Sequence, residues 1–184
     1  MALLEVRIFG DPVLRQRAHE VTDFDGRLAR LAEDMHATML DAPGVGLAAN
    51  QVGVLKRLFT WQVDEEGGAV VNPVVADASD DVEVDDEGCL SFPGLFYEVE
   101  RPLRIAVDWQ DVHGEPHRVE LEGFNARVWL HEMDHLNGVL FIDHLAKHDR
   151  KEAMKQMRLY REEHGVDVPG AGGVANLLLG RKTP

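Results

Sequence analysis

A short segment of the chain, HEMDH at positions 131–135, contains the residue types best suited to chemistry. Residues four apart on an α-helix lie one turn apart on the same face, so His131 and His135 can reach one metal ion. Glu132 lies about 100° round the helix from His131, where its carboxylate can exchange a proton with a metal-bound water without being a ligand. The simpler interpretation is two ordinary histidines in a chain that has nine. Because buried imidazoles one turn apart would be costly without a partner, we favour a metal-dependent hydrolase.

A catalytic metal site usually has three protein ligands and one open position, so a third ligand is needed. The pattern in which a third histidine follows six residues after the second is excluded, because Phe141 stands there. A zinc endopeptidase would instead take a glutamate from a later helix, and nothing distinguishes the three candidates. These are Glu152, Glu162 and Glu163. The only cysteine, Cys89, lies between a strand-like segment and a Pro-Gly turn, where a short loop could direct a thiolate toward the helix.

The helix that carries the motif is expected to be buried, because apolar residues occur almost all round it. It spans FNARVWLHEMDHLNG (124–138) and would end at Asn137-Gly138. Amphipathic helices are expected from about 24 to 41 and from about 145 to 164. Runs of β-type residues between the first and central helices indicate short strands. These are RLFTWQV, GAVVNPVV, LFYEVE, LRIAVDW and HRVELEG. We predict an α+β fold with short antiparallel or mixed β-sheets around a central buried helix, plus an N-terminal and a C-terminal helix.

The length and composition of the chain limit its architecture. With 184 residues, of which 45 % are apolar and 28 % charged, it is expected to form one soluble catalytic domain over residues 1–165. Residues 166–184 are Gly-rich and are expected to form a flexible or weakly docked tail. The N-terminus has no basic start followed by a long apolar run, so we expect no signal peptide, no membrane span and a cytoplasmic location.

The charges of the chain are unevenly distributed. A net charge of −14 argues against a nucleic-acid-binding surface over the whole domain, and no sequence-specific nucleic-acid binding is expected. Acidic residues gather in 77–87 around an alternating Val82 and Val84, which favours a half-exposed strand over a calcium loop. By contrast, residues 147–161 contain six Lys or Arg against two acids.

Three segments, in order, resemble the peptide deformylase family: GVGLAANQ (44–51), EGCLS (87–91) and HEMDH (131–135). The opening FGDPVLR and the later GVLFIDHL are also similar to that family, so the resemblance covers about residues 7–145. It implies an α+β fold with β-sheets around the metal helix. The implied activity is removal of the N-formyl group from nascent formyl-methionyl peptides, with release of formate.

The resemblance also implies a role for residues of these segments. The metal ligands would be Cys89, His131 and His135, with a water in the fourth position. Attack of this water on the formyl carbon creates an oxyanion, which needs donors besides the metal. Gln51 offers a side-chain amide and Leu90 a backbone N–H for that purpose. Glu132 would take the proton of the water and return it to the departing amine.

The glycine-rich segment before Gln51 is expected to bind the peptide. Without side chains, Gly44 and Gly46 allow an extended substrate backbone to approach and pair with the chain. A phosphate-binding loop is disfavoured, because the Gly-Lys-Ser/Thr ending is missing. Nearby apolar residues either form the pocket of the methionine side chain or are plain core. They are Val45, Phe124 and Val128.

Thiolate and imidazole ligands bind several divalent ions, so the ligand types do not identify the metal. Because the family often uses iron, the resemblance ranks Fe²⁺ first and Zn²⁺ second, with Ni²⁺ or Co²⁺ able to substitute. Two positions depart from the family: Leu130 stands where many relatives have glutamine, and no arginine follows closely after Gly94. We also expect Glu87 to pair with Arg101, since a carboxylate beside a thiolate needs a compensating charge.

The inferred partner is the nascent formyl-methionyl peptide, and no membrane partner is expected. The basic stretch 147–161 is either an ordinary solvated helix face or a helix that contacts ribosomal RNA. Two other functions compete: the zinc endopeptidase described above, and a binding module with a metal site but no catalysis. The presence of Glu132 argues against the binding module, because a site that only holds an ion has no use for a base beside it.

Overall fold

The computed structural model describes residues 2–166, so residues 167–184 of the predicted tail lie outside the described residues. The helices are α1 (Gly26–Asp41), α2 (Gly123–Leu136) and α3 (Lys147–His164). Three short helical turns are η1 (Pro12–Arg15), η2 (Ala49–Val52) and η3 (Phe141–Asp143). The strands are β1 (Gly46–Ala48), β2 (Leu58–Val63), β3 (Glu66–Ala78), β4 (Val82–Gly88), β5 (Phe96–Pro102), β6 (Arg104–Gln110) and β7 (Pro116–Glu122).

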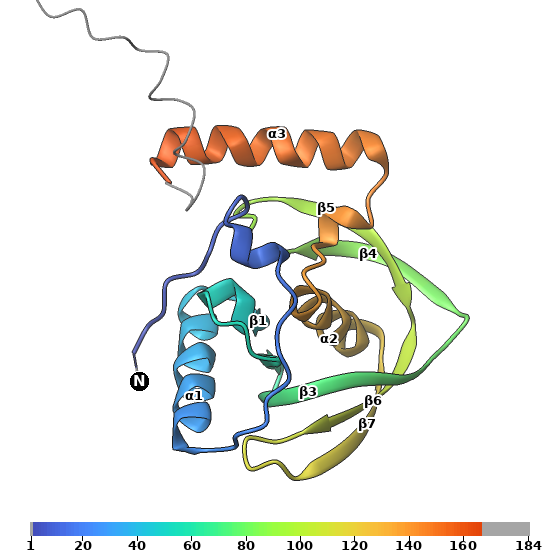
Figure 1. The fold of residues 1–184 in the computed structure, drawn as a ribbon. Helices are drawn as coiled ribbons and strands as arrows, with labels where there is room; N and C mark the ends of the chain where they lie inside the picture. The colour runs from blue at the N-terminus through green and yellow to red at the C-terminus, as the bar shows by residue number, and fades with distance from the viewer. Residues whose placement is uncertain (1, 167–184) are drawn as a thin grey trace, which may run out of the picture.

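The strands form two sheets, and every pairing between named strands is antiparallel. One sheet has the order β1-β2-β3-β6-β7, and the other is the two-stranded ribbon β4-β5. α2 lies at the centre of Figure 1, with α1 to one side and α3 across the outside near the β4-β5 ribbon. The predicted α+β fold around a buried helix is therefore confirmed, and its sheets are antiparallel rather than mixed.

The central position of α2 depends on Trp129, a side chain only 1 % exposed. The indole contacts Phe59 edge to face, with ring centroids 5.3 Å apart, and meets Trp61 at 5.5 Å. Trp109 of β6 also meets the indole edge to face, with ring centroids 5.9 Å apart. Such aromatic pairs add about 0.5–1.5 kcal/mol each beyond the area they bury. The helix is therefore anchored to the middle of the five-stranded sheet.

Helix α1 covers the β1 end of the same sheet. It begins where the Asp25 carboxylate accepts hydrogen bonds from the N–H groups of Arg27 and Leu28, which would otherwise lack partners. Its buried apolar residues recur at helical spacing and pack against Leu47 and Leu58. They are Leu28, Ala32, Met35 and Met39. The predicted helix of residues 24–41 is thus present with its apolar stripe inward.

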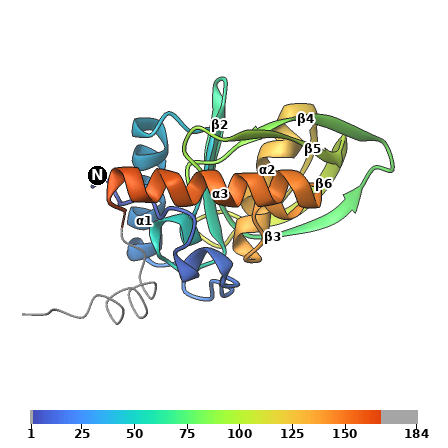
Figure 2. The same ribbon diagram turned by 90° about the horizontal axis from the view of Figure 1, so that it is seen from above.

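Helix α3 covers the loop that follows β4 (Figure 2). Its buried residues Ala153 and Met157 share a cluster with Phe92 and Phe141, and the rings of these two phenylalanines meet edge to face at 5.1 Å. This packing fixes the segment directly after Cys89. None of the helices in the described part of the chain is both long and apolar enough to cross a membrane.

Replacing Trp129 with alanine should lower the free energy of unfolding by about 3–5 kcal/mol, because the cavity left among three aromatic rings cannot collapse. Denaturant unfolding followed by circular dichroism measures this change. The matched control is Leu159→Ala on α3, where the side chain is 48 % exposed and the loss should be under about 0.5 kcal/mol. Equal losses in the two variants would contradict the anchoring role of Trp129.

Candidate metal centre and active site

Three donor atoms of Cys89, His131 and His135 lie within 4.8 Å of one another. The cysteine lies in the loop after β4, and both histidines lie on buried turns of α2. Within residues 2–166, no carboxylate joins this group as a further donor. The glutamates considered for an endopeptidase belong to α3 and are not part of it. These are Glu152, Glu162 and Glu163.

The donor set fits a tetrahedral divalent ion. The Cys89 Sγ and the His135 Nε2 are 3.3 Å apart, close to the ~3.6 Å that tetrahedral ligands at ordinary zinc–sulfur and zinc–nitrogen lengths would have. His131 uses its Nδ1 to contact Glu87 Oε2 at 3.0 Å, which leaves Nε2 for an ion. A carboxylate that holds the far nitrogen of a histidine ligand is the usual support of such sites.

The pKa values of the two histidines shift in opposite directions. Burial opposes a charge on His131, but the neighbouring Cys89 sulfur and the Glu87 carboxylate raise its pKa well above the ordinary value. Burial and the charge on His131 instead lower the pKa of His135 well below the ordinary value. The lowered pKa favours a neutral His135, which is the form that binds a metal, whereas the anionic neighbours of His131 favour a positive charge beside it, which a proton or a metal ion can supply.

Glu87 is a buried carboxylate that two arginines hold in place. Arg101 donates from Nε to Oε1 at 2.8 Å and from Nη2 to Oε2 at 3.0 Å, so the expected pairing is present. Arg127 donates from Nη1 to the same Oε1 at 3.0 Å. Burial alone would raise the pKa of Glu87, but the hydrogen bonds with His131 and Arg101 lower it to about 2. Glu87 therefore stays ionised and keeps His131 oriented.

The network continues from Arg101 to the far end of α2. Arg101 Nη1 donates to Asp134 Oδ2 at 2.7 Å, and the Nε2 of His144 contacts the same oxygen at 2.7 Å. Sequence reasoning missed both Asp134 and Arg127 as parts of the site. Arg127 offered a signal: an arginine on a helix predicted to be buried requires an acidic partner. Asp134 offered none, because its partner lies on a distant strand.

Glu132 is 4 % exposed, and its Oε2 has no hydrogen-bond partner among residues 2–166. Burial raises its pKa to about 7, opposed by the charge of His131 and assisted by that of Glu87. A Cβ at Gly46 would lie 2.3 Å from Glu132 Oε1, far inside contact distance. An added side chain at Gly46 would therefore displace the Glu132 carboxylate, which is a reason for glycine that the sequence did not show.

Gln51 and Leu90 lie beside the donor cluster. The Gln51 Oε1 accepts from the Ala48 N–H at 2.8 Å, which turns the amide nitrogen toward Cys89 Sγ at 3.5 Å and Ser91 Oγ at 3.2 Å. Leu90 follows Cys89 directly, and its N–H has no acceptor in the described part of the chain. Both groups offer N–H donors at the edge of the cluster.

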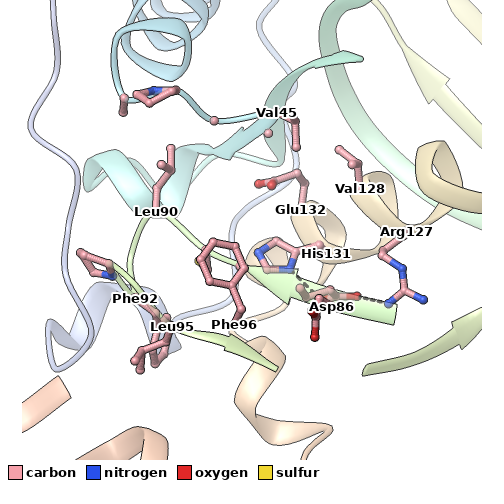
Figure 3. A pocket seen from close by; sticks show the side chains of 18 of the residues that line it. Val45, Asp86, Leu90, Phe92, Leu95, Phe96, Arg127, Val128, His131 and Glu132 are labelled. Carbon is pink, nitrogen blue, oxygen red and sulfur yellow. Dashed lines mark hydrogen bonds and ion pairs between the residues drawn. The ribbon is translucent and has the colours of Figure 1, made fainter. Parts of the chain in front are cut away.

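A cavity of about 580 Å³ opens next to these groups. Its walls include every residue predicted to bind substrate, together with Glu132 and His131. The predicted ones are Val45, Gly46, Phe124 and Val128. Figure 3 shows Val128 and Phe96 bordering the same cavity as Glu132 and His131.

Leu95 and Phe96, which sequence reasoning missed, follow Gly94 in the wall of the cavity, and Phe96 is 68 % exposed. Leu130 packs against the core outside the cavity. The rim of the cavity after Gly94 is thus apolar. Leu130, which differs from the glutamine expected from the family resemblance, does not contribute to the cavity walls.

Antiparallel sheets around a buried H-E-x-x-H helix, a neighbouring thiol and an apolar cavity together define an α+β hydrolase. Comparison with known proteins narrows this class. The model of the polypeptide deformylase family matches residues 3–151. The chain belongs to this family.

The similar proteins support this assignment at high identity. A peptide deformylase of Thermotoga neapolitana is 52 % identical over 143 residues, which cover 78 % of this chain and 87 % of that protein. The crystal structure of peptide deformylase from Thermotoga maritima has a TM-score of 0.78 at 49 % identity, covering 79 % of this chain and 99 % of the other. The structure from Legionella pneumophila has a TM-score of 0.85 at 35 % identity, covering 90 % and 99 %. The interpretation of the three sequence segments is confirmed, and the chain is an enzyme of this kind, not an endopeptidase or a binding module.

Replacing Gly46 with alanine should lower kcat/KM for a formylated peptide by about 100-fold, because a shift of Glu132 by about 1 Å is enough for a loss of that size. Steady-state kinetics of formate release measures it. The control is Gly26→Ala in the first turn of α1, where an added Cβ meets nothing within 4 Å and kcat/KM should not change. Full activity of the Gly46 variant would show that the close approach to Glu132 has no role.

Proposed function

We propose that this protein removes the formyl group from formyl-methionyl nascent peptides by means of one divalent ion, with Fe²⁺ ranked before Zn²⁺. The ion would be held by Cys89, His131 and His135. The observation that carries the proposal is the convergence of these donor atoms within 4.8 Å, beside a buried carboxylate and an apolar cavity. When bound, the ion supplies Lewis acidity, which makes water a nucleophile at neutral pH.

Glu132 is proposed as the residue that moves protons. Its pKa of about 7 suits a group that must accept a proton and release it near neutral pH. It takes the proton of the attacking water and passes it to the amine that leaves. The unpartnered Oε2 of this side chain supports the role, because no described hydrogen bond would have to break first.

Gln51 and Leu90 are proposed to stabilise the oxyanion that forms from the formyl carbonyl. The Gln51 amide is held by its bond from Ala48, so its N–H groups are oriented before substrate binds. Leu90 adds a backbone N–H from the loop that carries Cys89. Donors fixed in advance contribute about 2.7–4 kcal/mol each to such transition states.

The substrate peptide is proposed to lie along β1. This strand stands at the end of the five-stranded sheet, so its second edge has no strand partner among the described residues. An extended peptide could pair with that edge as an added strand, and Gly46 presents no side chain to hinder it. The methionine side chain would then enter the apolar part of the cavity near Phe124 and Val128.

We further propose that α3 contacts ribosomal RNA, where formylated chains emerge in the cytoplasm. Four basic residues recur along its exposed side at spacings of three to four residues: Lys147, Lys151, Lys155 and Arg158. Only the last two have acidic partners within residues 2–166, at 3.7 and 3.8 Å. A basic stripe of this kind on an acidic protein suits a phosphate backbone.

Anaerobically prepared, metal-loaded protein should release formate from a formyl-Met-Ala-Ser peptide, and metal analysis should identify the bound ion. Glu132→Gln should keep the metal and lower kcat by about 10²–10⁴-fold, because proton transfer is lost while the ligands remain. The matched control, Glu66→Gln, removes an exposed carboxylate on β3 and should retain full activity. No formate from the loaded wild-type protein would refute the proposed function.

Changing Lys147, Lys151 and Lys155 to glutamine should weaken co-sedimentation with ribosomes while leaving formate release from short peptides intact. Each lost phosphate contact should reduce the dependence of log K on log salt by about 0.7–0.9. A control variant in which Lys56 and Arg30 are neutralised tests whether loss of positive charge elsewhere on the protein also weakens ribosome binding. Unchanged binding of the triple variant would rule out α3 as the contact.

A further inference from the structure

The donors of the metal site come from two separate structural units. His131 and His135 lie on α2, which packs mainly on β1, β2 and β7 of the large sheet and touches β5 of the ribbon over a smaller area. Cys89 follows the β4-β5 ribbon, which is hydrogen-bonded only to itself among the named strands. The spacing between the sulfur and the imidazoles therefore depends on what holds the helix against the ribbon.

Arg127 makes this connection from α2, one turn before His131. Its side chain is 3 % exposed, and its guanidinium reaches both strands of the ribbon. Nη2 donates to the Glu83 carbonyl at 2.9 Å, and Nη1 donates to the Val99 carbonyl at 2.7 Å. Nη1 also lies 3.2 Å from the Asp85 carbonyl. One planar group thus binds carbonyls of β4 and β5 at once, which a lysine ammonium cannot reproduce.

The same guanidinium acts on the histidine through Glu87. Arg127 Nη1 donates to Glu87 Oε1 at 3.0 Å, and the other oxygen of that carboxylate holds His131 Nδ1. Arg101 belongs to the ribbon itself, so its bonds to Glu87 do not join the two units. Arg101 adds a second connection only at the far end of α2, where it binds Asp134.

We propose that Arg127 is a positioning residue for the metal site. It fixes α2 relative to the ribbon, and thereby sets the distance from the Cys89 sulfur to the two imidazoles. The inference rests on the proposed metal site. A purely structural role is the alternative, because removing one partner of a buried ion pair is in itself destabilising. Stability and metal geometry must therefore be measured separately.

The experiment compares Co²⁺ binding by the wild-type protein with that of Arg127→Met and Arg127→Lys. Methionine keeps an unbranched chain and removes the donors; lysine keeps the charge and loses the planar fork. Competition with a chelator should show a Co²⁺ affinity about 10–100-fold weaker in both variants, the usual cost of losing support behind a ligand. The thiolate-to-cobalt absorption band should shift or weaken. Arg118→Met, which removes an exposed pair with Asp108, should leave affinity and spectrum unchanged.

Circular dichroism and thermal unfolding establish which variants fold. If Arg127→Met does not fold, Co²⁺ binding by Arg127→Lys tests the proposal. Wild-type affinity and an unaltered cobalt band in a folded Arg127 variant would overturn the proposal, whatever its unfolding temperature. Failure of the wild-type protein itself to bind Co²⁺ would instead refute the metal site and the inference with it. Altered cobalt binding together with normal folding supports the positioning role.

Discussion

The site depends on one buried carboxylate. Glu87 accepts from Arg101 and Arg127 and holds His131, so a single side chain joins the ribbon, the helix and a proposed metal ligand. A carboxylate withdrawn from water is stable only when its oxygens are fully paired. The neighbours that pair these oxygens also fix the imidazole. The contacts that compensate the charge of Glu87 are therefore also the contacts that orient His131 in the donor cluster.

The helix that carries the histidines is held independently by apolar packing. Trp129, which does not line the cavity, anchors α2 to the sheet, while Gly46 allows β1 to approach the Glu132 carboxylate. The result is an acidic group with a pKa of about 7 in an apolar setting that excludes water from one side. Packing thus provides the setting that raises the pKa of an ordinary carboxylate toward neutral pH.

Local patterns in the sequence predicted the elements well. The periodicity of α1 and α2 and the β-type runs correspond to the observed helices and strands, and the H-E-x-x-H spacing identified the helix on which the histidines lie. The pairing of Glu87 with Arg101 followed from charge compensation alone. The contacts of Arg127 could not be predicted, because they join α2 to carbonyls of two strands about 28 to 44 residues earlier in the chain. The collision that requires Gly46 likewise arises only when β1 lies on α2.

The distance along the chain between the donors has a consequence for how the enzyme acquires its ion. Cys89 and His135 are 46 residues apart, and β5, β6, β7 and nearly all of α2 lie between them. A chain still being synthesised, or one that has folded only in part, cannot present the three donors together. The three proposed ligands can therefore come together only after this part of the chain has folded, so the proposed metal site would form late in the maturation of the protein.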